Sequence, residues 1–383
     1  MDHVYLDYAA TTPVRDEVRA AMAPYLSGVF GNPSSVHRWG REAEEALEQA
    51  RAELAESLGA EPSEITFVRG GTESDNLALL GWCGGQRALD ETPTVAISSI
   101  EHHAVLEAVE FATRTGLARS LRIGVTPEGA IDADAIRDAV ADGPTLVSVM
   151  WVNNESGMVL PLQDIAGIVK AAGATLHTDA AQAVGKVPVD VRELPVDLLS
   201  GTGHKIYAPK GTGFLFVREG TPLAPLLHGG GQERGVRPGT EDVAGAVGLA
   251  TAVRLAVAER ASETSRLLGL RDRLEVDLLQ ALDGIRVNAG EAPRAPHVLS
   301  VGLAGIEDGS ALVMALDLEG IAVSGGSACA SGSAKASHVM EALYGNDDPY
   351  AAVRFSLGKG TTNEHLQRAV TATVAVVTRM RDA

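Results

Sequence analysis

Short apolar segments alternate with amphipathic segments through the middle of this sequence, and this alternation most strongly constrains its fold. Apolar segments suited to buried strands lie at residues 65–68, 94–100, 146–152, 174–178, 196–200 and 213–217. Segments with helical periodicity separate several of them, at residues 72–82, 103–114 and 162–172. Strands spaced by helices of this length predict βαβ units around a mainly parallel, buried sheet. The chain is therefore expected to be an α/β protein.

The pattern changes near residue 240. Residues 240–282 form one long helical pattern rich in Ala, Leu and Arg. Beyond it, strands at 298–303 and 353–357 are mixed with helices at 310–318 and 363–380, which is typical of a smaller α+β unit. We predict a large α/β domain over residues 15–255 and a small domain over residues 256–383. Residues 1–14 are expected to associate with the small domain or the active site.

Composition limits the class of protein. Of the 383 residues, 45% are hydrophobic, which suits a chain that buries a large core. The 32 basic and 50 acidic side chains give a net charge of −18, which disfavours direct binding to nucleic acid or to an anionic membrane. We find no signal peptide and no apolar run of about 20 residues. With only Cys83 and Cys329, the sequence contains no disulfide framework, and we expect a cytoplasmic protein.

A lysine follows one of the predicted strands. Residues 196–205 read VDLLSGTGHK, so Lys205 comes after an apolar strand and a run of small residues. Apolar surroundings disfavour the ammonium form, so the pKa of this lysine should fall and its amine should become a nucleophile. The adjacent glycines and hydroxyls can bind a phosphate. The segment predicts a lysine that binds the aldehyde of pyridoxal 5′-phosphate, with an ordinary surface lysine as the alternative.

Further polar residues follow other predicted strands. Asp179 can pair with a protonated pyridine nitrogen, and Gln182 can donate to the ring oxygen of the same cofactor. His102 can stack on a planar ring and transfer protons. Each of these residues also has a purely structural explanation, as a turn cap or a hydrogen-bonded core histidine.

The turn at residues 70–76, GGTESDN, joins a predicted strand to a predicted helix. Its backbone N–H groups and the Thr72 hydroxyl can bind an anion, although a plain helix cap has the same residues. Ligands of parallel sheets bind outside the carboxyl ends of the strands. One pocket is therefore expected to collect Thr72, Asp179 and Lys205.

Two further residues carry potential chemistry. Cys329 lies in a run of small residues at 324–333, SGGSACASGS, where a thiol is better suited to act as a travelling nucleophile than as a core residue. A tight turn in which Cys replaces Ser is the alternative. Arg354 interrupts an apolar strand, and its guanidinium can clamp a substrate carboxylate or form a structural ion pair. Cys83 ends an apolar stretch and is expected in the core.

The chain resembles the cysteine desulfurases, which are class-V aminotransferase-like enzymes that use pyridoxal phosphate, almost from end to end. The matching motifs are, in order, YLDYAATTP at 5–13, GNPSS at 31–35, GTESDN at 71–76, EH at 101–102, VNNESG at 152–157, GGGQERG at 229–235, RPGT at 237–240, GSAC at 326–329 and RFSLG at 354–358. The GSAC motif points to the NifS/IscS-like branch, which has a long cysteine loop, about residues 324–336 here. The resemblance implies the aspartate aminotransferase-like fold type I, with a mainly parallel seven-stranded sheet.

The resemblance also implies roles for individual residues. Residues implied to bind pyridoxal 5′-phosphate are Gly71, Thr72, His102, Asp179, Gln182, Thr202, His204, Lys205 and, from the partner subunit of a homodimer, Thr240. Asn154 and Arg354 are implied to bind the substrate. Lys205, His102 and Cys329 are implied to be catalytic. No resident metal is implied, although Cys329 is a candidate ligand of a transient iron–sulfur cluster.

The activity implied is the removal of sulfur from L-cysteine, giving L-alanine and a persulfide on Cys329. An acceptor protein would take the sulfur for iron–sulfur cluster assembly, tRNA thiolation or a related transfer. Alternatives are a selenocysteine lyase, another class-V lyase or aminotransferase, and a noncatalytic cofactor-binding protein. The thiol loop argues against transamination, which needs no thiol. The sequence names neither the acceptor nor the preference for cysteine over selenocysteine.

Overall fold

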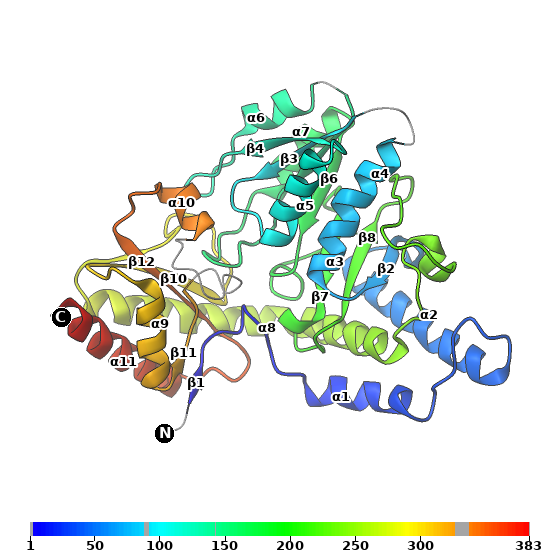
Figure 1. Ribbon diagram of the computed structural model, residues 1–383. Helices are drawn as coiled ribbons and strands as arrows, with labels where there is room; N and C mark the ends of the chain where they lie inside the picture. Colours follow the sequence, from blue (N-terminus) through cyan, green and yellow to red (C-terminus); the bar gives the residue numbers. More distant parts are fainter. Residues whose placement is uncertain (1–2, 88–91, 142, 326–336, 383) are drawn as a thin grey trace.

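A computed structural model describes residues 3–87, 92–141, 143–325 and 337–382 (Figure 1). The predicted cysteine loop, including Cys329, lies largely outside these described residues. The largest sheet has seven strands in the order β2-β8-β7-β6-β5-β3-β4. They are β2 (Ile65–Val68), β3 (Thr94–Ser98), β4 (Arg119–Ile123), β5 (Thr145–Ser148), β6 (Thr175–Asp179), β7 (Leu198–Thr202) and β8 (Gly213–Val217). Of these strands, β8 runs antiparallel to both neighbours and the others are parallel, which confirms the predicted mainly parallel sheet.

Helices cover both faces of this sheet because successive strand residues point to opposite sides. On one face, Val95 and Ile97 pack with α5 (His103–Arg114) and with the helical run of α3 (Gly71–Asn76), η3 (Leu77–Gly81) and α4 (Trp82–Arg87). On the other face, Ala96 packs in the core that contains residues of α2, α6, α7 and α8. Those helices are α2 (Arg38–Leu58), α6 (Ala133–Ala139), α7 (Leu162–Ala171) and α8 (Val243–Ala281).

Two predicted strands are shorter than expected. The predicted strands at 94–100 and 146–152 end at Ser98 and Ser148. Beyond these ends, the buried carboxyl of Glu101 links β3 and β5 in place of a direct backbone hydrogen bond. Its Oε1 accepts from Ser98 Oγ at 2.6 Å and from the Met150 N–H at 2.7 Å.

A second core lies around a smaller antiparallel sheet, ordered β12-β10-β9. Its strands are β9 (Ile285–Val287), β10 (Val298–Ala304) and β12 (Tyr350–Ser356), and nearby helices are α9 (Gly309–Leu318), α10 (His338–Tyr344) and α11 (Asn363–Arg381). Near the N-terminus, β1 (Val4–Tyr5) pairs in parallel with β11 (Ile321–Ala322). The N-terminal segment thus starts in this second unit and reaches the turn after β7, where the Thr12 N–H donates to the His204 carbonyl at 2.9 Å. It then continues into α1 (Asp16–Met22), which lies beside α8 (Figure 1).

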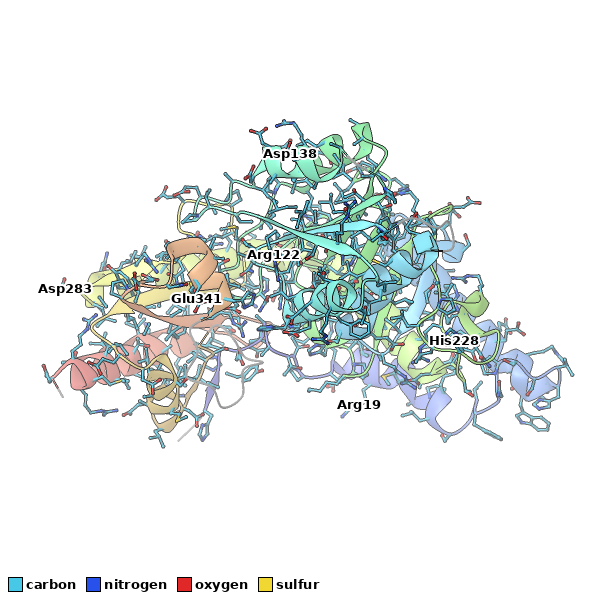
Figure 2. All side chains as sticks on the ribbon, turned by 45° about the horizontal axis from the view of Figure 1, so that its top comes forward. Arg19, Arg122, Asp138, His228, Asp283 and Glu341 are labelled. Carbon is cyan, nitrogen blue, oxygen red and sulfur yellow. The ribbon has the colours of Figure 1, made fainter. Side chains whose placement is uncertain are left out.

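The long helix α8 belongs to both cores. Residues near its start, such as Leu249 and Val253, pack in the large core, and residues near its end, such as Leu274 and Leu278, pack in the second core. The predicted domain boundary at residues 255–256 falls inside this helix. No helix in the described part of the chain is long and apolar enough to cross a bilayer. The labelled Arg19, Asp138 and Asp283 are examples of charged side chains that are exposed on the outside of the molecule (Figure 2).

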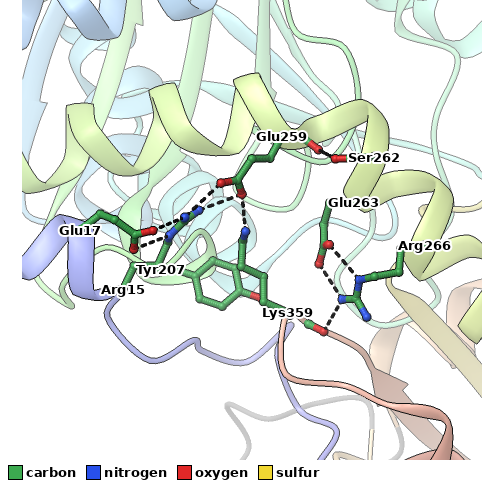
Figure 3. Close-up of polar contacts among 9 residues, drawn as sticks. Arg15, Glu17, Tyr207, Glu259, Ser262, Glu263, Arg266 and Lys359 are labelled. Atoms are coloured by element: carbon green, nitrogen blue, oxygen red, sulfur yellow. Dashed lines mark hydrogen bonds and ion pairs between the residues drawn. The ribbon is translucent and has the colours of Figure 1, made fainter.

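An ion cluster joins three parts of the chain at the middle of α8 (Figure 3). The guanidinium of Arg15 donates to the two carboxylate oxygens of Glu259 at 2.9 and 3.0 Å. Lys359, from the loop between β12 and α11, forms an ion pair with the same carboxylate. One turn further along the helix, Arg266 pairs with Glu263 at 2.7 Å and donates to the Gly358 carbonyl at 2.8 Å. The N-terminal segment and the loop after β12 are thereby tied to one stretch of α8.

Candidate active site

A cavity lies at the carboxyl end of the large sheet, with an empty volume of about 1210 Å³ that includes open solvent. Its lining contains most of the residues singled out from the sequence: Gly71, Thr72, His102, Asn154, Asp179, Gln182, Thr202, His204, Lys205 and Arg354. The grouping of Thr72, Asp179 and Lys205 in one cavity follows from the sheet, because β6 and β7 are neighbours with Asp179 opposite Ser200. Thr240 is exposed and does not line this cavity.

Lys205 ends the short turn Gly203–Lys205 that follows β7. Its Nζ donates to the backbone carbonyls of Ala9 and Ala10, at 2.7 Å each. These carbonyls come from the N-terminal segment, which passes over the edge of the large sheet. The amine of Lys205 is thus held in the cavity by acceptors that carry no full charge.

Asp179 is the last residue of β6 and is 6% exposed. Its Oδ1 accepts from the N–H of Ala181 at 2.8 Å. Burial raises the pKa of Asp179, while the nearby His102 and Lys205 act in the opposite direction. A buried carboxylate is suited to pair with a cationic group placed in the cavity.

His102 is the residue before α5, and its Nδ1 accepts from the N–H of Ala104 at 3.1 Å. Burial lowers the pKa of His102, so the neutral ring is favoured. Because Nδ1 is an acceptor, the proton of the neutral ring resides on Nε2. The ring can therefore offer an N–H to the cavity that it lines.

The opposite end of the cavity offers small residues and hydroxyls. Gly70 has a φ of 137°, which favours glycine, and a Cβ on Gly71 would have Thr202 side-chain atoms as its nearest neighbours, at 3.7 Å or more. The backbone of Gly71 therefore lies close to the side chain of Thr202. His204, whose Nδ1 lies 3.2 Å from Thr11 Oγ1, has its pKa lowered to about 4, chiefly by burial and then by Lys205. Neutral donors and backbone N–H groups at this end suit a phosphate.

Arg354 projects from β12 and is 1% exposed. Its Nη2 lies 2.7 Å from Oδ1 of Asp7, and its Nη1 donates to the carbonyl of Asn154 at 2.6 Å. Its buried Nε has no hydrogen-bond partner among the described residues. The structure therefore shows the ion pair that was one of the two interpretations, and it places the guanidinium in the cavity lining. The role of Arg354 in binding a substrate carboxylate stays a prediction.

Comparison with known proteins decides the family. The family model for class-V aminotransferases matches residues 4–369. The cysteine desulfurase IscS of Dictyoglomus turgidum is 41% identical over 379 residues, which cover 99% of this chain and 95% of that protein. The chain belongs to the cysteine desulfurases of the class-V aminotransferase family.

Solved structures agree with this cysteine desulfurase assignment. A structure described as a NifS-like protein superposes with a TM-score of 0.89 at 34% identity, covering 98% of this chain and 100% of that one. A structure of SspA in complex with cysteine superposes with a TM-score of 0.78 at 34% identity, covering 92% and 98% of the two chains. The predicted fold type is therefore confirmed, as is the NifS/IscS-like recognition.

Cysteine desulfurases depend on pyridoxal 5′-phosphate, which confirms the cofactor predicted from the sequence. The cavity fits this group. It has a primary amine at Lys205, a buried carboxylate at Asp179, and the hydroxyl residues Thr72 and Thr202 beside the backbone of Gly71. Such a donor set matches an aldehyde, a pyridine nitrogen and a phosphate.

The sequence analysis missed several residues of this cysteine desulfurase cavity. Asp75, His103, Glu155 and His338 also line it. Asp75 belongs to the GTESDN motif that was recognised in the sequence. Its burial is the main reason why its pKa is raised well above the usual value. The contact of His338 Nε2 with the Glu101 carbonyl, 2.8 Å, left no signal in the sequence because the two residues lie 237 positions apart.

The structure describes only one of the two cysteines. Cys83 is fully buried, as expected of a core residue, and burial raises the pKa of its thiol to about 12. Cys329, the expected nucleophile, lies outside the described residues, so its assignment stays a prediction from the sequence.

Proposed function

We propose that the protein is a cysteine desulfurase that removes sulfur from L-cysteine and keeps it as a persulfide on Cys329. The observation that carries this proposal is the single cavity that holds Lys205, Asp179 and Arg354 together. An amine, a buried carboxylate and a buried guanidinium are the three groups needed to bind the cofactor and an amino-acid substrate.

Each residue has a distinct role in this proposal. When bound, pyridoxal phosphate supplies an electron sink for the substrate Cα. Lys205 attaches the cofactor, and its amine, once free, takes the proton from Cα onto Nζ. Asp179 would keep a proton on the ring nitrogen, Gln182 would donate to the ring oxygen, and the neutral His102 would stack on the ring and offer its Nε2–H.

The remaining cavity residues hold charged groups in place. Gly71, Thr72, Thr202 and His204 would bind the phosphate at the open end of the cavity. Asn154 and Arg354 would bind the substrate carboxylate, and the unpartnered Nε of Arg354 is a donor ready for it.

The thiolate of Cys329 would attack the substrate Sγ. The new S–S bond would form while the Cβ–Sγ bond breaks. The electron pair of the broken bond would stay on the substrate carbon, which takes up a proton to become the methyl group of alanine. The persulfide then passes to a sulfur-acceptor protein. The chain is proposed to work in the cytoplasm, in iron–sulfur cluster assembly, tRNA thiolation or a related transfer.

A homodimer is part of this proposal. Leu26, Phe30, Val36 and Trp39 expose between 54% and 90% of their surface within one short segment. Val29 of this segment packs with Val243, close in sequence to the exposed Thr240. Exposed apolar side chains grouped in this way are typical of a protein interface. A second copy would cover them, and Thr240 would reach the phosphate of the partner subunit.

The Cys329→Ser variant tests the proposal, with Cys83→Ala as the matched control. Cys329→Ser should bind pyridoxal phosphate, with its visible absorbance intact, but form no alanine or persulfide from cysteine. Cys83→Ala should retain both products because its thiol is sealed in the core. If Cys329→Ser forms alanine at the wild-type rate, the assignment of the nucleophile is wrong. Selenocysteine supplied in parallel separates a desulfurase from a selenocysteine lyase.

A further inference from the structure

Lys186 lies behind the wall of the active-site cavity and takes no part in the reaction described above. It lies four positions after Gln182, and its Nζ donates to Oε1 of Gln182 at 2.8 Å. Burial, and then the nearby Lys205 and Arg354, lower the pKa of Lys186 well below its usual value. A lysine amine is costly to bury among other cations, so a simple packing role is better filled by an apolar residue.

The backbone of the turn holds Lys186 in this place. Gly185 has a φ of 73°, and a Cβ on it would lie 2.5 Å from the Cβ of Ala256 in α8. The turn after β6 is therefore pressed against α8 in a conformation that requires glycine. Thr264 of α8 also donates to the carbonyl of Lys186, at 3.2 Å. The side chain of Lys186 thus starts from a backbone fixed on both sides.

The side-chain oxygen of Gln182 has two partners. Besides Lys186, the Nε2 of His297 lies 3.2 Å from it. Burial is the main cause that lowers the pKa of His297 well below its usual value, so the ring is neutral. Its Nδ1 has no partner among the described residues, which places the proton on Nε2, where it is donated to Gln182. The two donors on this oxygen determine which way the amide of Gln182 points.

The NH2 group of Gln182 consequently faces the N-terminal segment. Its Nε2 donates to the carbonyl of Ala9 at 2.8 Å. The same carbonyl accepts from Lys205 Nζ at 2.7 Å. A continuous hydrogen-bonded chain therefore runs from Lys186 through Gln182 and Ala9 to Lys205.

We propose that Lys186 is a positioning residue that holds the amide of Gln182 with its oxygen away from the active-site cavity and its NH2 group toward Ala9 and the cavity. The inference rests on the proposed function, in which that NH2 group donates to the ring oxygen of the cofactor. Lys186 touches neither cofactor nor substrate. Its effect reaches the reaction through the orientation of Gln182.

The first test compares the Lys186→Met holoenzyme with the wild type and with Lys210→Met, a control at an exposed position. The measurements are the half-time of cofactor loss during dialysis and the pH midpoint of the cofactor's visible absorbance, both without cysteine. We expect Lys186→Met to lose cofactor about tenfold faster, the scale of one hydrogen bond, and to shift the pH midpoint. Lys210→Met should match the wild type. Equal half-times for Lys186→Met and the wild type would overturn the proposal.

A double-mutant cycle separates positioning from general damage to the fold. In a Gln182→Leu background no amide remains to be oriented, so adding Lys186→Met should change the half-time less than twofold. A tenfold effect in both backgrounds would contradict the proposal. Lys186→Arg retains a donor and should restore the half-time to within about twofold of the wild type, which Lys186→Met cannot do.

If Lys186→Met does not fold, Lys186→Gln replaces it. Its side-chain nitrogen is one bond closer to the backbone and loses the contact with Gln182, so the same tenfold loss is expected in the wild-type background and none in Gln182→Leu. These measurements do not involve cysteine turnover. A wild-type protein that binds cofactor but forms no alanine would disprove the proposed desulfurase activity and leave the result on Lys186 standing.

Discussion

The buried Arg354 forms an ion pair with the partly buried Asp7, with Nη2 and Oδ1 2.7 Å apart and 347 positions between the two residues. Asp7 lies just after β1, and its backbone bridges to Ser356 at the end of β12. The residue proposed to bind the substrate carboxylate is therefore oriented by the N-terminal segment. The same segment supplies the carbonyls that hold Lys205.

Replacement of Arg354 by lysine should impair substrate binding. An ammonium lacks the planar fork and cannot contact Asp7, Asn154 and a substrate carboxylate at once. We expect kcat/KM for cysteine to fall about 100-fold, chiefly through a higher KM, since one charged bidentate contact contributes roughly 1.5–3 kcal/mol. Alanine release at varied cysteine concentrations measures this. A wild-type KM in Arg354→Lys would show that the ion pair with Asp7 is the whole role of Arg354.

Asp7→Asn should change cysteine binding in the opposite direction. The amide oxygen can still accept from Arg354, but the negative charge that competes with a substrate carboxylate is removed. We expect KM for cysteine to fall severalfold while the visible absorbance of the cofactor is unchanged. A raised KM would instead indicate that the charge of Asp7 is needed to orient the guanidinium.

Part of this site was predictable from the sequence because parallel strands direct their carboxyl ends to one edge. Thr72, Asp179 and Lys205 each follow a strand that its apolar run identified, and the structure brings them to one cavity. The fold class followed from the same alternation. The role assigned to each site residue remains a prediction. Thr240 is exposed outside the cavity, and Cys329 lies outside the described residues.

The rest depended on contacts between distant parts of the chain. No local pattern indicates that the carbonyls of Ala9 and Ala10 accept from Lys205, nearly two hundred positions away. The sequence analysis also missed α2, whose buried face includes Leu47, Leu54 and Leu58. It missed β4 because four of its five residues are exposed at the edge of the sheet and no apolar run marks them. Edge strands lack the continuous apolar pattern of central ones.

Glu101→Gln should change the pH dependence of stability. Burial is the main cause that raises the pKa of Glu101 from 4.5 to about 8. Between these two pH values, Glu101 is ionised in the unfolded chain but keeps its proton in the folded protein. The free energy of unfolding therefore falls as pH rises towards 8. Above pH 8 the contribution of Glu101 no longer changes with pH. Glutamine resembles the protonated acid and does not ionise, so Glu101→Gln should not show this decrease in stability.

The measurement is the thermal midpoint of the wild type and of Glu101→Gln at pH 5.5, 7 and 9. These pH values, about 1.5–2 units apart, cover most of the range over which the contribution of Glu101 to stability changes. Relative to the wild type, Glu101→Gln should gain stability as pH rises, by an amount on the order of a few kcal/mol. The exposed Glu45→Gln on α2 is the control and should show no such trend. A difference between Glu101→Gln and wild type that stays constant with pH would contradict the assignment of a neutral Glu101.

Glu259→Gln should loosen the junction at the middle of α8. The carboxylate of Glu259 lies between Arg15 and Lys359, and its removal leaves two cations without their shared partner. Because the Glu259 side chain is 34% exposed, we expect a loss of only about 1 kcal/mol, which should shrink as salt is added. Asp16→Asn is the control, since its ion pair with Arg19 is 86% and 77% exposed and should contribute nothing measurable. Thermal unfolding at low and high salt is the measurement. If Glu259→Gln is as stable as the wild type at low salt, the ion pairs of Glu259 do not stabilise this junction.

Alkylation of the native protein should distinguish its two cysteines. Cys83 is fully buried within the core around α4, and its pKa of about 12 leaves almost no thiolate at neutral pH. Iodoacetamide should therefore leave Cys83 unmodified in the folded protein, modify Cys329 in proportion to the loss of alanine formation, and modify both after denaturation. Peptide mass spectrometry identifies the labelled residue. If Cys83 is labelled in the native protein as fast as in the denatured chain, the core around it opens. If activity is lost while neither cysteine is labelled, the essential group is not a thiol of this chain.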